Sequence, residues 1–145
     1  MFVCWGGKTL AWGSEQLGMM KSLGVLPQCV VVNLGTNDMK NEFASPTELG
    51  ERLTGFLAGA AVRRLVIVDI WADVAIAPAS MGEVSEAPEV FRKAVSGRPG
   101  TTLVPWSAEA MADSALGGWD GVHDSAQGEA VRARAIADGV AAACG

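Results

Sequence analysis

His123 is the one histidine among the 145 residues, and Asp120 precedes it by three positions in a Trp-Asp-Gly-Val-His segment. On a helical turn, residues at this spacing share one face, so the spacing predicts that the carboxylate and the imidazole meet. A carboxylate beside an imidazole holds one tautomer and stabilises the imidazolium that forms when the ring takes a proton. The pair is therefore a candidate general base with its orienting acid. A surface aspartate and a surface histidine without a chemical role remain the alternative, because so short a motif also occurs by chance.

Asn37 is a second candidate, because it follows an apolar run. Residues 30–34 are Val-Val-Val-Asn-Leu, and residues 35–38 are Gly-Thr-Asn-Asp. Such a run is typical of a strand buried on both faces inside a parallel sheet. Ligands of open α/β sheets bind just past the carboxyl ends of the strands, where the Asn37 amide can donate two hydrogen bonds. A strand that simply ends in a polar turn explains the same residues, because Gly, Asn and Asp are turn formers.

Taken together, the two segments resemble blocks of the SGNH hydrolases, the GDSL-type esterases and lipases. Residues 35–38 are similar to the third block of that family, whose Asn donates to the oxyanion. Residues 120–123 are similar to the fifth block, which supplies the acid and the base of a triad. The Gly-Gly-Lys-Thr-Leu of residues 6–10 is similar to the second block, where a Gly backbone N–H joins the oxyanion hole. The blocks also occur in the family's order, and the resemblance covers nearly the whole chain.

The resemblance implies a role for each of four residues. Asp120 and His123 would be catalytic, and Gly7 and Asn37 would bind the oxyanion and the substrate. No cofactor is implied, and no metal is expected, because one histidine and scattered carboxylates do not make a metal site.

The family's first block, a Gly-Asp-Ser that carries the nucleophile, does not occur in this sequence. Ser14, Ser107, Ser114 and Ser125 are all interpreted as helix caps or helix faces. We therefore expect an SGNH domain that lacks its first strand and its serine, with at most weak activity. In an alternative alignment, residues 1–5 are the family's first strand and Thr9 is the nearest hydroxyl.

The expected fold is α/β. Alternating strands and helices predict parallel pairing with right-handed crossovers, and no repeat or linker divides residues 1–145, which are expected to form a single, N-terminally incomplete domain. By resemblance the fold is a three-layer α/β/α, flavodoxin-like sheet that lacks its first strand. An incomplete sheet leaves an edge open to self-association and lowers stability. The expected strands span residues 1–5, 30–34, 65–71 and 101–106.

Helices are expected between these strands. Ser14 is the predicted cap of the first, which ends at Gly24. Ser45, with a Pro and a Glu after it, predicts a capping box for the next helix, whose core side chains are Leu49, Leu53, Phe56, Leu57 and Ala60. Further helices are expected at residues 88–95, 107–116 and 126–143, the last capped by Ser125.

Two further features lie near the expected site. Residues 72–86 form a loop that could be one wall of a substrate cleft, with Val74, Ile76 and Met81 suited to an acyl group, or could be a tolerated surface loop. Trp119 is interpreted as a packing residue rather than a platform for substrate.

The composition limits the class of protein. Half of the residues are hydrophobic, 19% are charged and the net charge is −5, which indicates a globular protein and argues against a nucleic-acid partner. No apolar run is long enough to span a membrane, and the first ten residues contain no export signal, so the compartment is left open. Cys4, Cys29 and Cys144 have no metal or redox spacing; buried thiols are expected, with one disulfide as the alternative.

Three hypotheses for function follow. The first is hydrolysis of a carboxylic ester or O-acyl group, or transfer of the acyl group, on a small-molecule, carbohydrate or lipid ester through a Ser-His-Asp mechanism whose serine this chain lacks. The second is a catalytically dead SGNH-like module that binds an acylated ligand. The third is a gene fragment or misplaced start codon, with an ordinary esterase as the true protein.

Overall fold

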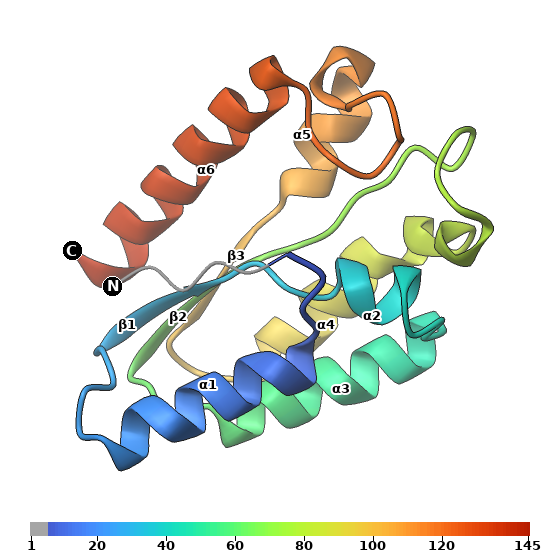
Figure 1. Cartoon of the computed structure of the whole chain (residues 1–145). Helices are drawn as coiled ribbons and strands as arrows, with labels where there is room; N and C mark the ends of the chain where they lie inside the picture. The colour runs from blue at the N-terminus through green and yellow to red at the C-terminus, as the bar shows by residue number, and fades with distance from the viewer. Residues whose placement is uncertain (1–5) are drawn as a thin grey trace.

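The sheet has three parallel strands in the order β1-β2-β3, in the computed structural model, which describes residues 6–145 (Figure 1). Val31 of β1 is in register with Val66 of β2, which is in register with Thr102 of β3. The predicted parallel α/β fold is therefore confirmed, while the strand expected at residues 1–5 lies outside the described residues. The strands are β1 (Cys29–Val32), β2 (Arg64–Val68) and β3 (Thr101–Val104).

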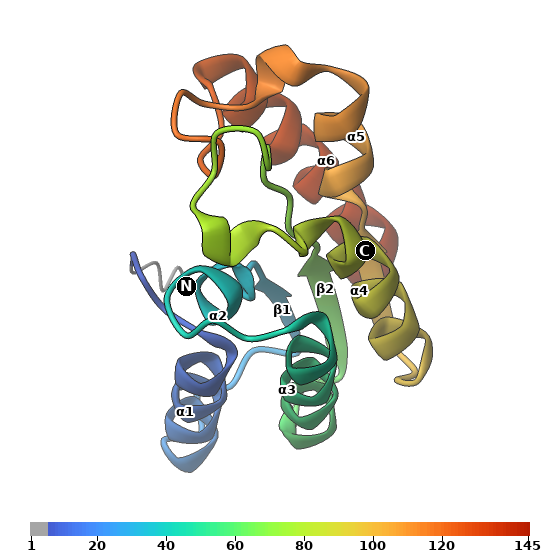
Figure 2. The ribbon, with the colours of Figure 1, turned by 90° about the vertical axis from the view of Figure 1, so that its right-hand side faces the viewer.

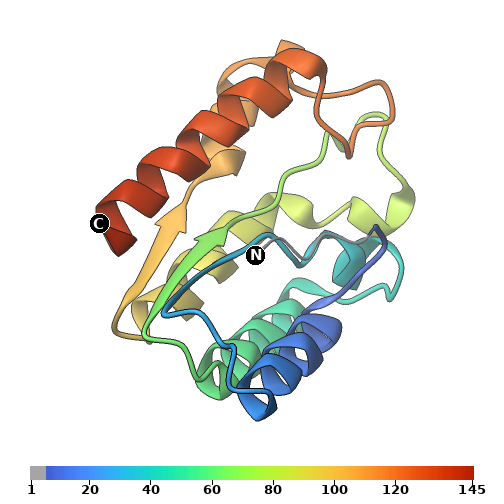
Figure 3. The ribbon, with the colours of Figure 1, turned by 60° about the vertical axis from the view of Figure 1, so that its left-hand side comes forward.

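Helices cover the sheet on opposite faces (Figures 2 and 3). One layer contains α1 (Leu10–Ser22), α3 (Pro46–Gly59) and α4 (Ala87–Ser96). The other contains α5 (Trp106–Ala112) and α6 (Ala126–Cys144), and α6 packs on β2 and β3. These layers give the three-layer α/β/α arrangement that was expected.

Alternation along β2 divides the core between the two faces. Leu65 and Ile67 pack with the α1, α3 and α4 side, whereas Val66 and Val68 pack with the α5 and α6 side. All four side chains are at most 1% exposed, as a central strand with helices on both faces requires. The helix stripe predicted from the sequence is buried on the first face: Leu49, Leu53, Phe56, Leu57 and Ala60.

Helix caps follow the sequence signals in two of three cases. The Ser45 hydroxyl accepts from the backbone N–H of Glu48, and the Glu48 carboxylate accepts from the Ser45 N–H, which completes the predicted capping box. The Ser125 hydroxyl accepts from the Gly128 N–H at the start of α6. Ser14, however, is inside α1, which begins at Leu10, so its prediction as a cap is wrong.

β1 is less buried than the sequence predicted. Val32 is 7% exposed, but Val31 is 41% exposed, so the expectation of a strand buried on both faces is wrong there. Val31 shares its face with Val66 because the two are register partners, and on that face α6 packs over β2 and β3. The helix layer therefore covers the neighbouring strands better than it covers β1.

Cys29 at the start of β1 and Cys144 at the end of α6 form a disulfide, with their Cα atoms 6.0 Å apart. The alternative of one disulfide is therefore correct for these two cysteines, and the expectation of buried thiols is wrong for them. Cys4 lies outside the described residues. The bond fastens the C-terminal helix to the strand that leads toward Asn37.

The connection after β2 is the long loop that the sequence predicted, with two short 3₁₀ turns, η1 (Ala79–Met81) and η2 (Val84–Glu86). Val74 and Ile76 are more than half exposed, but Met81 is fully buried in the core. Met81 is therefore not available to line a cleft, because it packs inward beside α2 (Thr36–Lys40). None of the helices in residues 6–145 is both long and apolar enough to span a bilayer.

Candidate active site

Asp120 and His123 are in direct contact. Their Oδ2 and Nδ1 atoms are 2.6 Å apart, and the other carboxylate oxygen of Asp120 accepts from the backbone N–H groups of Val122 and His123 at 3.0 and 2.9 Å. The segment is a turn rather than the helical turn that was expected, and the Asp120 side chain itself closes it. Local hydrogen bonding therefore brings the pair together.

Hydrogen bonds within the turn stabilise the negative charge of the Asp120 carboxylate. The backbone N–H of His123, the His123 ring and the backbone N–H of Val122 all donate to the carboxylate, and together they hold its pKa well below the usual range. An ionised carboxylate can only accept, so Nδ1 of His123 carries the proton in this contact. In the neutral imidazole Nε2 then has a free lone pair, and the His123 side chain is 75% exposed. This is the tautomer that a general base needs.

The turn is carried on a loop that is closed at its base. Gly117 and Asp124 form an antiparallel bridge, and the Gly118 N–H donates to the His123 carbonyl at 2.7 Å. A Cβ at Gly118 would stand 2.7 Å from that carbonyl oxygen, so a glycine is required there. The geometry of His123 is therefore set by the backbone of residues 117–124.

The same loop rests on the long loop after β2. The Asp73 N–H donates to the Gly121 carbonyl at 2.7 Å. Gly121 has a φ of +73°, and a Cβ there would lie 2.7 Å from Ile76 Cγ1. Both the left-handed conformation and the close approach require glycine. The loop after β2 therefore packs directly against the His123 turn.

Asn37 lies in the first turn of α2, after Gly35, whose φ of +121° strongly favours glycine. Its Nδ2 donates to the Lys8 carbonyl at 3.1 Å, and its Oδ1 accepts from Asn41 Nδ2 at 2.9 Å. One of the two Nδ2 hydrogens remains for a ligand. Gly7 and Asn37 are the two residues expected to bind the oxyanion. The contact with Lys8, which directly follows Gly7, holds these two segments together.

Asp38, next to Asn37, also links α2 to the start of α1, and the sequence analysis did not predict this role. The carboxylate is fully buried, accepts from the Leu10 N–H at 3.0 Å and is paired with Arg52 at 3.2 Å. Burial raises the pKa of Asp38, and the Leu10 and Arg52 hydrogen bonds oppose that rise. Local sequence carries no signal for this role, because the partners are 28 and 14 residues away.

A second buried carboxylate, Asp69, lies just beyond β2. It accepts from the N–H and the hydroxyl of Ser107 at 2.8 and 2.6 Å, and burial is the main cause that raises its pKa. Ser107 is the second residue of α5, so its interpretation as part of a helix face is correct, and at 2% exposure this face is buried. Its hydroxyl anchors α5 to the end of β2.

The elements that contain Asn37 and His123 can be followed in the ribbon (Figure 1). Figure 1 shows α2, which contains Asn37, and the loop of residues 117–124 on the side where the strands end. The loop after β2 lies between them in this view. Within residues 6–145, no serine or threonine hydroxyl is hydrogen-bonded to the His123 ring, whose bonded partner is Asp120.

Trp119 next to the pair is 94% exposed, so its interpretation as a packing residue is wrong. Trp119 belongs to neither core cluster, whereas Val122 of the same turn packs against the cluster on the α1, α3 and α4 side. Trp119 joins the exposed Val74 and Ile76 in giving this end of the molecule an apolar character.

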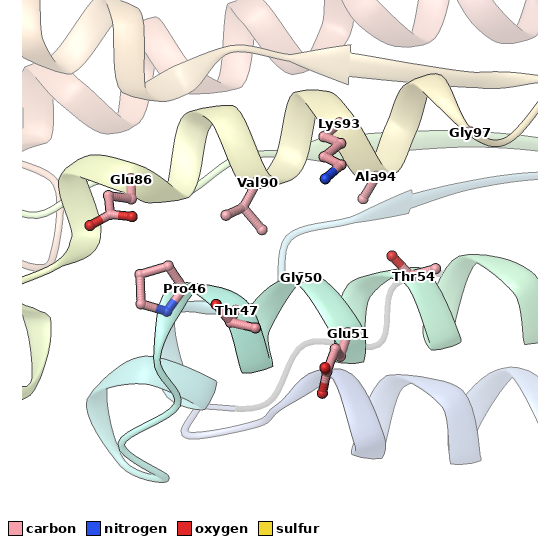
Figure 4. Close-up of a pocket in the computed structure, with 10 residues that line it drawn as sticks. All are labelled: Pro46, Thr47, Gly50, Glu51, Thr54, Glu86, Val90, Lys93, Ala94 and Gly97. Atoms are coloured by element: carbon pink, nitrogen blue, oxygen red, sulfur yellow. The ribbon is translucent and has the colours of Figure 1, made fainter.

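Two surface hollows are lined by residues other than Asn37 and His123. A groove of about 710 Å³ runs between α3 and α4, and Figure 4 shows its lining side chains. It lies away from Asn37 and His123, neither of which lines it. A smaller hollow of about 320 Å³ lies between the loop after β2 and α5, and Trp71, Val74, Ser107 and Met111 are among its lining residues. In the part of the chain that the structure describes, no three His, Cys, Asp or Glu side chains are grouped as metal ligands would be.

Comparison with solved structures identifies the fold. A lipase/acylhydrolase from Enterococcus faecalis superposes with a TM-score of 0.77 at 16% identity, over 92% of this chain and 71% of that one. The catalytic domain of peptidoglycan O-acetyltransferase A from Streptococcus pneumoniae gives 0.77 at 18% identity, over 94% and 76%. AlinE4, an SGNH-hydrolase family esterase, gives 0.58 at 25% identity, over 96% and 73%. No protein-family profile and no curated protein sequence matches.

The fold is therefore that of the SGNH hydrolases, as the sequence motifs predicted, here with a three-stranded sheet in the described residues. Its solved neighbours include hydrolases and a transferase of acyl groups.

Proposed function

We propose that this chain carries the acid–base pair and the oxyanion donors of an SGNH-type site, which hydrolyses an ester or transfers its acyl group. The observation that carries the proposal is the 2.6 Å contact between Asp120 and His123, which occupies Nδ1 and leaves Nε2 of the exposed ring directed away from Asp120 as the nitrogen available to a substrate or nucleophile. The contact from Asn37 to Lys8 supports the second half of the site, since it joins the two segments expected to bind the oxyanion.

In this mechanism, His123 takes the proton of a serine hydroxyl as the oxygen attacks the ester carbonyl. Asp120 keeps the ring in its tautomer and stabilises the imidazolium. The free Nδ2 hydrogen of Asn37 and the Gly7 N–H donate to the oxyanion that develops. The imidazolium then returns its proton to the leaving alcohol, and water or an acceptor alcohol releases the acyl group.

The nucleophilic serine is assigned to a Gly-Asp-Ser segment outside this sequence. The names of two structural neighbours, a lipase/acylhydrolase and a peptidoglycan O-acetyltransferase, support a proposal for the substrate class. We therefore propose a small acyl ester on a carbohydrate or lipid alcohol as the substrate.

The test begins with the coding DNA upstream of Met1, which is expected to contain an in-frame strand that ends in Gly-Asp-Ser. The extended chain should hydrolyse p-nitrophenyl acetate, and a fluorophosphonate should label its new serine. His123→Ala should abolish turnover, and Asn37→Ala should reduce kcat by ~10²–10³. Arg134→Gln, an exposed change on α6, should leave the rate unchanged.

Two results would refute the proposal. One is a hydrolysis rate of the extended chain that His123→Ala leaves intact. The other is the lack of any upstream segment, combined with no hydrolysis above the His123→Ala background; saturable binding of an acylated ligand would then favour a binding module.

A further inference from the structure

Arg132 on α6 makes contacts from three sides. Its Nη1 donates to Asp124 Oδ2 at 2.7 Å, and its Nη2 donates to Asn33 Oδ1 at 2.6 Å. The guanidinium carbon lies 5.5 Å from the centre of the Trp106 ring. The Arg132 side chain is 20% exposed and that of Asp124 is 7% exposed, so the pair is mostly shielded from water. Such contacts hold a side chain in one position.

These contacts link the two halves of the candidate site. Asn33 directly follows β1, on the segment that leads to Asn37, and it is 99 residues from Arg132 in the sequence. Asp124 directly follows His123 and forms the bridge with Gly117 that closes its loop. A single guanidinium therefore ties the end of β1 to the base of the histidine loop.

We propose that Arg132 is a positioning residue for His123. It fixes the loop that contains the imidazole relative to the end of β1 and the segment that leads to Asn37. The effect of this role on catalysis rests on the proposed function. The effect of Arg132 on the position of the His123 ring can be measured without any turnover. Arg132 touches neither Asp120 nor the imidazole, so it acts through Asp124 and the loop backbone.

The shape of the guanidinium matters to this role. Its planar fork presents two nitrogens to two acceptors on different segments, while its face lies against Trp106. A lysine ammonium is a compact point charge on a flexible stem, so it can replace the charge beside Asp124 but not the double link. Arg132→Lys should therefore behave like a loss of the link rather than a conservative change.

The experiment compares Arg132→Gln and Arg132→Lys with Arg134→Gln, which removes an exposed arginine two residues away on the same helix. Because His123 is the one histidine in the chain, a nitrogen-15 spectrum of labelled protein reports its ring without overlap. The Nδ1–H proton should be visible in the wild type and in Arg134→Gln. In both Arg132 variants it should exchange with water at least several-fold faster, with the folded amide spectrum otherwise retained.

In the active, extended protein the same two variants should lower kcat by ~10–100-fold with little change in KM, because a small misplacement of a catalytic group costs rate rather than binding. A lower melting temperature with an unchanged Nδ1–H signal would show a purely structural arginine and overturn the proposal. Full retention of the signal and of kcat in Arg132→Lys would also overturn it. Altered signals without any ester hydrolysis would leave the positioning role standing and refute only the proposed function.

Discussion

Replacing Asp120 with asparagine should reverse the tautomer of His123. One Asp120 oxygen accepts the two backbone N–H groups that close the turn, and the other faces Nδ1 at 2.6 Å. In Asp120→Asn the amide oxygen can keep the turn, which places the amide NH₂ opposite Nδ1. Two donors cannot share that contact, so Nδ1 must become the acceptor and the proton must move to Nε2.

The cost can be estimated from this geometry. With Nε2 protonated, the ring cannot take the proton of the nucleophile, and a loss of the correct tautomer lowers kcat by about 10⁴ in a Ser-His-Asp site. A factor of 10⁴ corresponds to about 5 kcal/mol in the activation free energy. Because the turn is retained, we expect KM to change little.

Two assays measure the change. Long-range proton–nitrogen correlation spectra of the single histidine assign its tautomer in the chain itself, and ester hydrolysis gives kcat in the extended protein. Asp113→Asn is the matched control, because Asp113 also accepts a backbone N–H, from Ala115 at 3.0 Å, but has no histidine partner. Retention of the Nδ1–H tautomer in Asp120→Asn, or a kcat within a few-fold of the wild type, would refute the reasoning.

The remaining predictions concern the scaffold. Cys144→Ser opens the link to Cys29, and because the two lie 115 positions apart in sequence, chain entropy predicts a loss of ~2–5 kcal/mol in the free energy of unfolding. The melting temperature should fall, and a reductant should not lower it further. Gly121→Ala adds a Cβ 2.7 Å from Ile76 Cγ1 at a φ of +73°, and should cost ~1–3 kcal/mol in urea unfolding while speeding exchange of the His123 Nδ1–H. The raised pKa of Asp38 means that its stabilising contribution, relative to Asp38→Asn, is present below pH 3.8 and falls as pH rises through the folded pKa. Urea unfolding of both proteins between pH 3 and 7 checks the sign, and a difference that grows with pH would contradict it.

Local patterns allowed much of the fold to be predicted. The valine-rich run at β1, the continuous apolar run of β2 and the apolar stripe of α3 each depend on residues that are neighbours in sequence. The Ser45 capping box is equally local. These patterns predicted most of the described elements and their order, although the helix expected at residues 107–116 ends at Ala112, and a short 3₁₀ turn follows it. Alternating strands and helices leave few topologies besides a parallel sheet.

Predictions failed where the outcome depends on what covers a residue. Val31 has the same local sequence pattern as a buried strand position, yet it is 41% exposed, because α6 lies over the neighbouring strands. Trp119 and Met81 were misjudged for the same reason, one turned outward and the other inward. The apolar character of a side chain does not specify which element packs against it.

The sequence by itself determined which functional groups are present: the Asp120 carboxylate three residues before the one imidazole, and the Asn37 amide just past a strand. Only the tertiary structure decided how these groups are held, through the buried Asp38, the link from Asn33 through Arg132 to Asp124, and the disulfide of the last helix. The physical reason is distance along the chain. Contacts within a turn are set by local backbone geometry, whereas these contacts join residues up to 115 positions apart and form only once the whole domain has folded.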